Sequence, residues 1–185
     1  MTIFSNLALW LLRYYGGLEK LELLAFDSFV QNRTLEERKP RIVLVTVSES
    51  DIQKLEKWPL SDAKLATLLQ NINQQKPRAI GLDIYRDLPI APGSADLERV
   101  YRSIPNLIVI QKVAGTRVSP PKVMVELGQT AANDLVLDQD GRVRRFLLSL
   151  VDRNEAIVLS LSLRLALIFW KKKVLPLPSK EKTLF

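Results

Sequence analysis

The sequence predicts an α/β fold: a mostly parallel sheet with helices on both faces, an antiparallel hairpin, and a long amphipathic N-terminal helix before them. Short β-branched runs alternate with amphipathic helical segments, which is typical of βαβ units. Right-handed crossovers then place helices on both faces of the sheet. With 47% hydrophobic residues in 185, the chain can bury a sizeable core in one domain.

The N-terminal helix is predicted over residues 18–33, LEKLELLAFDSFVQNR. Leu18, Leu21 and Phe29 fall on one face of this helix, while its acidic residues fall elsewhere. The charged segment TLEERKP ends the helix, because Pro40 favours an extended chain.

Three continuous apolar runs predict strands buried on both faces, at residues 41–47, 79–84 and 106–113. Helices are predicted at residues 49–57, 62–75, 96–104 and 155–170, and residues 115–129 as an irregular loop. Ser61 provides the N-cap of the second helix, and Pro105 stops the third.

The stretch from Asn133 to Leu150 predicts a hairpin centred on Asp140-Gly141, the dipeptide that two-residue turns favour. A calcium loop is disfavoured there, because the arginines that follow would repel a cation. Strand alternation predicts that Arg145 points toward the acids of the sheet and Arg144 toward solvent. A buried arginine needs a carboxylate, and Asp83 or Asp27 would provide it. The alternative to such a structural ion pair is that Arg145 binds an anionic ligand.

Composition excludes most common enzyme machinery. The chain has no His and no Cys, which removes histidine relays, thiol catalysis, thiolate metal sites and disulfides. No dinucleotide or triphosphate loop motif occurs. The basic tail after Trp170 supplies +4 of the net charge of +7, and no basic stripe with interleaved aromatic residues indicates nucleic-acid binding.

No segment of the sequence predicts a complete membrane span. The uncharged run Thr2–Leu12 has 11 residues, about half of the ~20 that a span needs. The run Ala156–Trp170 contains Arg164 and has polar residues at helical spacing, which favours a packed amphipathic helix. We interpret Thr2–Leu12 as the end of a truncated span.

Candidate ligand-binding residues follow the first two predicted strands, because ligands of open parallel sheets bind beyond the carboxyl ends of the strands. Glu49 and Asp83 fall there, Trp58 could form a wall, and Arg145 is the candidate anion partner. With Asp51, the two acids could instead hold a divalent cation or act as an acid/base pair. Structural roles are favoured over a catalytic or ligand-binding role for these residues. Glu49 and Asp51 suit a first helical turn, Asp83 would order a loop, and Trp58 would belong to the core.

An ordered set of motifs resembles the CHASE family, type 2, the cyclase- and histidine-kinase-associated sensory extracellular domains. The motifs run through residues 18–170 in order: LELLAFD, RIVLVTVSES, WPLSDAKLATLLQNI, PRAIGLDI, Asn133, DQDGRVRR and SLSLRLALIFW. This sequence departs from the family at Ser48, where members tend to have the first acid of an Asp-Glu pair. Members also continue into further loops and membrane helices, so we expect the front part of such a domain.

The resemblance implies an extracytoplasmic sensory domain of a membrane-anchored bacterial signal-transduction protein, facing the periplasmic side and not catalytic by itself. We expect residues 1–33 to form a membrane-proximal helix, residues 34–170 the sensory domain and residues 171–185 a basic, proline-containing tail. The expected partners are an unidentified small-molecule or environmental ligand, the membrane through flanking segments, and a second copy through the N-terminal helix. No cofactor and no nucleic acid is expected.

Two other functions are kept as alternatives. One is a metal-dependent hydrolase or lyase that uses Glu49, Asp51 and Asp83. The other is a structural module that only dimerises or binds a partner. Metal soaking separates the first alternative from a sensor, and removal of residues 1–33 tests the second.

Overall fold

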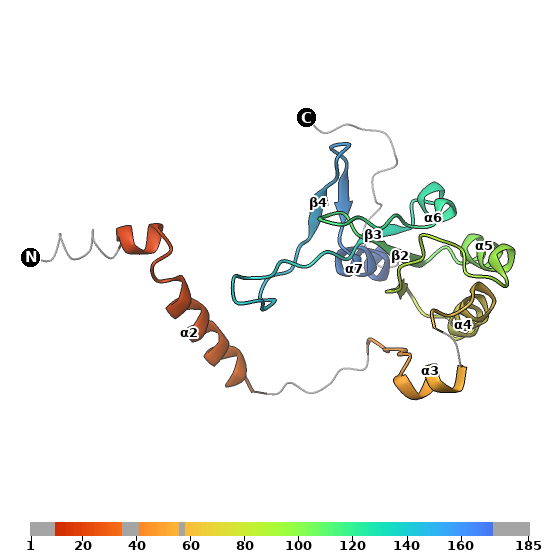
Figure 1. The fold of residues 1–185 in the computed structure, drawn as a ribbon, viewed down its shortest axis with the longest axis horizontal. Helices are drawn as coiled ribbons and strands as arrows, with labels where there is room; N and C mark the ends of the chain where they lie inside the picture. The colour runs from red at the N-terminus through yellow and green to blue at the C-terminus, as the bar shows by residue number, and fades with distance from the viewer. Residues whose placement is uncertain (1–9, 35–40, 56–57, 172–185) are drawn as a thin grey trace, which may run out of the picture. The chain divides into compact units, whose positions relative to one another are not determined.

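The computed structural model describes residues 10–34, 41–55 and 58–171 (Figure 1). The chain divides into two units, Met1–Val47 and Ser48–Phe185. The second unit contains, in chain order, α3 (Glu49–Leu55), α4 (Asp62–Gln74), β1 (Ile80–Leu82), α5 (Ser94–Ser103), β2 (Leu107–Gln111), α6 (Lys122–Glu126), β3 (Thr130–Ala132), β4 (Ser149–Val151), β5 (Ile157–Leu159) and α7 (Leu161–Lys171). The predicted α/β class is confirmed.

The central sheet is parallel, with the strands in the order β1-β2-β3. Ile80 pairs with Leu107 at one end of the sheet, and Gln111 pairs with Ala132 at the other. The order follows the chain, so successive right-handed crossovers place their helices on the same face. This explains why α5 and α6 pack against each other, beside α4.

The main core lies between this sheet face and the helices α4, α5 and α6. Alternate strand residues point toward it, since side chains along a strand alternate between the two faces. The buried cluster comprises Leu65, Ala66, Leu69, Ile80, Leu82, Leu97, Val100, Tyr101, Ile104, Leu107, Val109, Val123 and Met124. Ser61 caps α4 by accepting a hydrogen bond from the Lys64 backbone N–H, as its sequence predicts.

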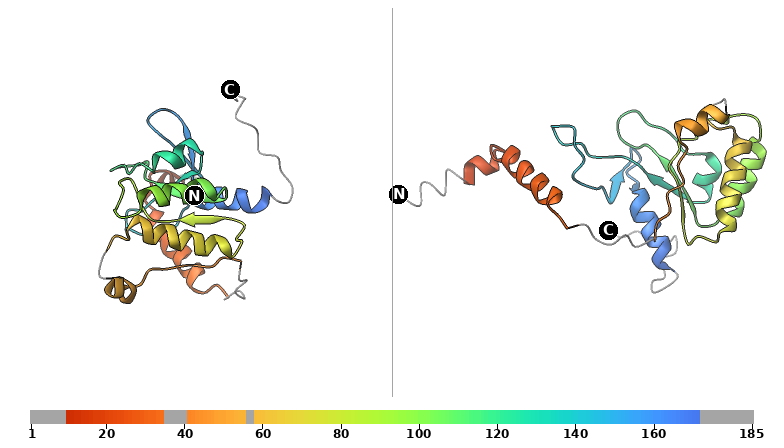
Figure 2. Two further views of the ribbon diagram at one scale, coloured as in Figure 1. Left: turned by 90° about the vertical axis from the view of Figure 1, so that its right-hand side faces the viewer. Right: turned by 90° about the horizontal axis from the view of Figure 1, so that it is seen from below.

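Helix α7 covers the opposite face of the sheet. It contacts all three strands, and Figure 2 shows it across the sheet from α4 and α5. A Cβ built on Gly81 would lie 2.8 Å from Leu165 Cδ1 and 3.5 Å from Leu161 Cδ1. The glycine therefore permits close packing of α7 on β1. Helices on both faces of the sheet are confirmed.

The strand predicted at residues 41–47 is wrong. Residues 42–47 form no strand, and Ile42, Val43 and Leu44 are 82–83% exposed. A strand is stabilised by hydrogen bonds to a neighbouring strand. This segment belongs to the unit Met1–Val47, whereas the sheet belongs to the other unit.

Two other segments also differ from the predicted elements. Helix α6 and strand β3 occupy residues 122–126 and 130–132, in and just after the expected irregular loop. The final helix begins at Leu161 rather than Glu155, because Ile157–Leu159 pairs with Ser149–Val151 as an antiparallel ribbon. In both cases, pairing with a neighbouring strand decides the conformation of a three-residue segment.

The hairpin at Asp140-Gly141 is present, with a loop one residue longer than expected. The Asp138 N–H donates to the Arg142 carbonyl, and the Gly141 N–H donates to the Asp138 carbonyl. Gly141 has φ +77, which suits the left-handed position of a three-residue loop. The flanking chain forms a single isolated bridge, Val136 to Arg145. Regular pairing follows only at β4 and β5.

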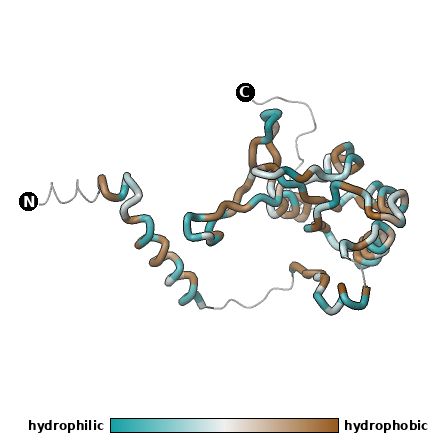
Figure 3. Tube along the Cα trace, in the orientation of Figure 1, coloured by the Kyte–Doolittle hydropathy of each residue, from teal (hydrophilic) through white to brown (hydrophobic). Residues whose placement is uncertain are grey.

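The N-terminal unit contains the helix α2 (Glu19–Gln31), which has no buried residue. Residues 10–14 are also helical, and a turn at residues 15–18 separates the two helical segments. A single helix through residues 10–33 is therefore not supported, although α2 lies within the helix predicted at residues 18–33. Gly16, with φ +74, explains the break, because this backbone conformation does not continue a right-handed helix. Hydrophobic residues such as Leu21 and Phe29 are exposed on α2. Figure 3 shows hydrophobic positions interspersed with hydrophilic ones along this helix.

No helix in residues 10–34, 41–55 and 58–171 is both long and apolar enough to span a bilayer. Most of the run Thr2–Leu12, the hinge at residues 35–40 and the tail at residues 172–185 lie outside the described residues.

Candidate functional site

The carboxyl ends of the three parallel strands meet at one edge of the sheet. Asp83 directly follows β1, and Asn133 directly follows β3. The Asn133 side-chain amide donates to Asp83 Oδ1 at 2.6 Å, and the Asn133 backbone N–H donates to the Gln111 carbonyl at 3.1 Å. These bonds connect the ends of all three strands, at the place where open parallel sheets bind ligands.

Two more residues complete a polar cluster there, which we call the carboxyl-edge cluster: Asp83, Tyr85, Asn133 and Asp134. The Asp134 carboxylate accepts hydrogen bonds from the backbone N–H groups of Val113 and Ala114, at 2.9 and 2.8 Å. Burial raises the pKa of Tyr85, and the negative charges of Asp134 and Asp83 raise it further. The phenol therefore keeps its proton at neutral pH, and it is 39% exposed.

The sequence predicts Asp83 at this edge but not Tyr85 or Asp134 as its companions. The placement of Asp134 depends on β3, whose three residues are too few to show a strand pattern in the sequence. Asn133 has a sequence signal only through its position in the family motifs. The cluster offers two carboxylates, an amide and a neutral phenol, which can orient a polar ligand by hydrogen bonds.

The acids at the start of α3 have the structural role that suits a first helical turn. The Asp51 carboxylate accepts hydrogen bonds from the Ser48 backbone N–H at 2.9 Å and from the Ser48 hydroxyl at 2.6 Å. These bonds lower the pKa of Asp51. Glu49 is exposed in the same turn. Asp51 therefore stabilises the start of the helix, as in a capping box.

Trp58 lies in the connection before α4 and is 48% exposed. The expectation of a core tryptophan is therefore wrong at this position. For the metal alternative, the described residues contain no group of three or more acidic side chains placed to hold a metal ion. Asp83 is bonded to Asn133 and Asp51 to Ser48.

The predicted orientation of the hairpin arginines is reversed. The Arg144 side chain is only 6% exposed, whereas that of Arg145 is 65% exposed. Arg144 donates to Asp138 Oδ2 at 2.8 Å and to Asp140 Oδ2 at 2.6 Å, and Arg145 also donates to Asp138. The buried arginine is therefore Arg144, and its carboxylate partners are the hairpin acids Asp138 and Asp140. The sequence had suggested Asp83 or Asp27 as the partner. Asp27 lies on α2 in the other unit.

The reversal has a local cause. Strict alternation of side chains holds for a regular strand, but the chain around Arg144 makes only the isolated bridge described above. Hydrogen bonds from Arg145 and Arg144 lower the pKa of Asp138. The pKa of Asp140 falls to about 2, chiefly through its hydrogen bond with Arg144. These ion pairs hold the loop together.

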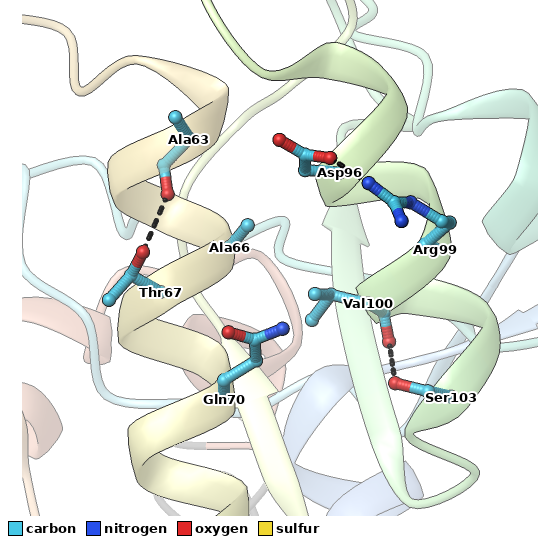
Figure 4. A pocket seen from close by; sticks show the side chains of 8 residues that line it. All are labelled: Ala63, Ala66, Thr67, Gln70, Asp96, Arg99, Val100 and Ser103. Carbon is cyan, nitrogen blue, oxygen red and sulfur yellow. Dashed lines mark hydrogen bonds and ion pairs between the residues drawn. The ribbon is translucent and has the colours of Figure 1, made fainter.

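A groove of about 410 Å³ lies between α4 and α5 (Figure 4). Small and polar side chains line it: Ala63, Ala66, Thr67, Gln70, Asp96, Arg99, Val100 and Ser103. Several of its polar groups are bonded within their own helix. Thr67 donates to the Ala63 carbonyl, Ser103 to the Val100 carbonyl, and Arg99 pairs with Asp96. The groove is therefore a weaker candidate than the carboxyl-edge cluster.

Comparison with known proteins identifies the family. Neither the curated proteins nor the solved structures contain a match to this chain. The family model described as the CHASE2 domain matches residues 5–183, nearly the whole chain. This agrees with the ordered motifs in the sequence and with the α/β architecture. The chain therefore belongs to the CHASE2 family of extracellular sensory domains.

Proposed function

We propose that this chain is the ligand-sensing input domain of a membrane-anchored bacterial signal-transduction protein, and that it is not catalytic by itself. The domain faces the periplasmic side and responds to a small-molecule or environmental signal. Family membership supports the sensory role. The observation that carries the ligand site is the hydrogen bond of Asp83 with Asn133, which links the outer strands β1 and β3 across the end of β2.

The proposed ligand binds over the carboxyl-edge cluster, with Asp83 at its centre. A ligand that hydrogen-bonds Asp83 competes with the Asn133 amide, and so changes the bond that links β1 to β3. To shift a two-state sensor tenfold, the ligand must bind the two states with affinities that differ by about 1.4 kcal/mol. Breaking or strengthening one hydrogen bond to a charged group is of this size.

Glu49 and Trp58 remain proposed contacts, because both are exposed and available to a ligand. Arg145 remains a proposed contact only for an anionic ligand. Such a ligand would have to compete with the Asp138 carboxylate, to which Arg145 already donates. We therefore rank Arg145 below Asp83.

The N-terminal unit has the proposed role of linking the sensor to the membrane and to a second copy. The exposed apolar residues of α2, among them Leu24 and Phe29, support this role. No residue of α2 is buried, and pairing with another helix would remove these apolar side chains from water. Sedimentation of the full chain and of a chain lacking residues 1–33 tests dimerisation.

Membrane topology is tested in the full-length receptor, by fusing reporter proteins directly after its sensory domain. A reporter active only outside the cytoplasm is expected to be active, and one active only in the cytoplasm is expected to be silent. The opposite pattern would show that the periplasmic assignment is wrong.

Ligand binding is tested by thermal unfolding with a panel of amino acids, sugars, polyamines and small carboxylates. We expect one compound to raise the unfolding temperature of the wild type and to act at least about tenfold more weakly on Asp83→Asn. The matched control is Glu98→Gln, which neutralises an exposed acid on α5. Equal loss of the response in both variants would remove Asp83 from the site.

A further inference from the structure

Three buried polar side chains from separate elements meet beside the main core. They are Asp62 in the first turn of α4, Arg86 in the loop after β1, and Tyr101 on α5, and they are between 2% and 5% exposed. Arg86 Nη1 lies 3.6 Å from Asp62 Oδ1, an ion-pair distance longer than a hydrogen bond. Within the described part of the chain, Arg86 Nε, Nη1 and Nη2, Asp62 Oδ1 and the Tyr101 hydroxyl have no hydrogen-bond partner.

The donors in this cluster outnumber its acceptors. A guanidinium has five N–H donors and no acceptor. Asp62 Oδ2 already accepts hydrogen bonds from the Ile90 N–H at 3.0 Å and the Ser94 hydroxyl at 2.7 Å. Burial raises the pKa of Tyr101, so its hydroxyl stays protonated and is a donor as well. The Nε/Nη2 edge of Arg86 and the Tyr101 hydroxyl therefore require acceptor atoms.

The electrostatic surroundings favour an acceptor that carries negative charge. The N-termini of α4 and α5 converge here: the Ala63 N–H donates to the Pro92 carbonyl at 2.8 Å, and Ser94 at the start of α5 donates to Asp62. Each helix N-terminus contributes about half a positive charge. The single negative charge of Asp62 roughly balances either the two helix N-termini or Arg86, but not both, so the cluster keeps an excess of positive charge. Asp87, which follows Arg86, is exposed and screened by solvent, and Asp96 in the first turn of α5 is exposed and paired with Arg99.

From these contacts we infer that Arg86, with Tyr101 and the converging starts of α4 and α5, forms a binding site for a small oxyanion. The planar Nε/Nη2 edge suits two oxygens of one group, such as those of a carboxylate or phosphate. The first-turn N–H groups of Asp62 and Ala63 already donate to loop carbonyls, so the helices act through their dipoles. Binding at this site is independent of the sensory proposal and does not require the anion to be the signal.

The test is isothermal titration calorimetry of the full chain with acetate, formate and inorganic phosphate, at constant ionic strength set with chloride. We expect one of the three to bind saturably with one site per chain. Arg86→Lys keeps the charge but loses the paired edge, and should weaken binding at least about tenfold. Tyr101→Phe removes one donor and should weaken binding about fivefold. Tyr101→Phe also tests the site if the Arg86→Lys variant does not fold.

The matched control is Arg99→Lys, an exposed arginine in the middle of α5 that pairs with Asp96. It should leave the affinity within about twofold. The inference is overturned if none of the three anions binds saturably, or if Tyr101→Phe and Arg86→Lys bind like the wild type. It is also overturned if Arg99→Lys weakens binding as much as Arg86→Lys. A crystal structure grown in the tightest-binding anion that places only water on Arg86 would overturn it as well.

Discussion

Replacement of Gly93 by alanine is expected to destabilise the domain strongly. Gly93 precedes α5 and has φ +99, a conformation that residues with a Cβ rarely adopt. A Cβ at this position would lie 2.5 Å from the backbone nitrogen of Ala63 and 2.6 Å from its Cα. The Ala63 Cβ would also lie 2.5 Å away, and none of these three atoms moves when a side chain rotates, so no rotamer change relieves the overlap. The starts of α4 and α5 must therefore separate.

Two costs add to give the expected magnitude. The left-handed conformation costs an alanine about 1–2 kcal/mol. Separating the helices also breaks the hydrogen bond from Ala63 N–H to the Pro92 carbonyl and weakens the contacts of Asp62 with Ser94, at about 1 kcal/mol or more for each bond. We expect a total loss of about 3–5 kcal/mol from a domain stability of about 5–15 kcal/mol.

Urea unfolding followed by far-UV circular dichroism measures this loss as a lower transition midpoint. Gly128→Ala is the matched control, because Gly128 has φ +65 and a Cβ there meets no atom within 4 Å. It should lose only the conformational cost of about 1–2 kcal/mol. If both variants lose the same stability, the close approach of Gly93 to Ala63 contributes nothing and the reasoning is refuted.

Three further outcomes are expected. Leu69→Ala, at a core position that is 1% exposed, should lose about 2–5 kcal/mol in the same urea assay, whereas Leu135→Ala, at a position 61% exposed, should lose under about 0.5 kcal/mol. The pKa of Asp140 is lowered from 3.8 to about 2, so the contribution of its carboxylate to stability is present above pH 4 and is lost as pH falls toward 2. Between pH 4 and pH 2 the unfolding temperature of Asp140→Asn should therefore fall less than that of the wild type. Parallel curves for the two proteins would contradict this. In Asp83→Asn the pKa of Tyr85, followed by ultraviolet titration of the phenol, should fall, because one of the negative charges that raises it is removed. Glu98→Gln, on the exposed surface of α5, should leave the pKa of Tyr85 unchanged.

The candidate site was predictable only in part. Asp83 follows a recognisable strand, and strand ends are where open sheets bind ligands. Its partner Asn133 follows β3, which has only three residues, too few for a period to be visible. The pairing of Arg144 with Asp138 and Asp140 depends on how a three-residue loop turns the chain. A sequence shows which charges are present, but the geometry of the turn selects which of them meet.

The sequence by itself determined those elements of this protein that carry a cap or a clear hydrophobic pattern. Helix α4 begins at the residue that its Ser61 cap predicts, and β1 and β2 fall inside their predicted apolar runs. Helix caps and hydrophobic periodicity depend on only a few neighbouring residues, so they can be recognised from the local sequence. Only the tertiary structure decided which β-competent segments became strands. Residues 41–47 carry a longer apolar run than Thr130–Ala132, yet only the latter is a strand, since it lies beside β2 and hydrogen-bonds to it. A strand is completed by a partner that is distant in sequence, and local sequence cannot specify that partner.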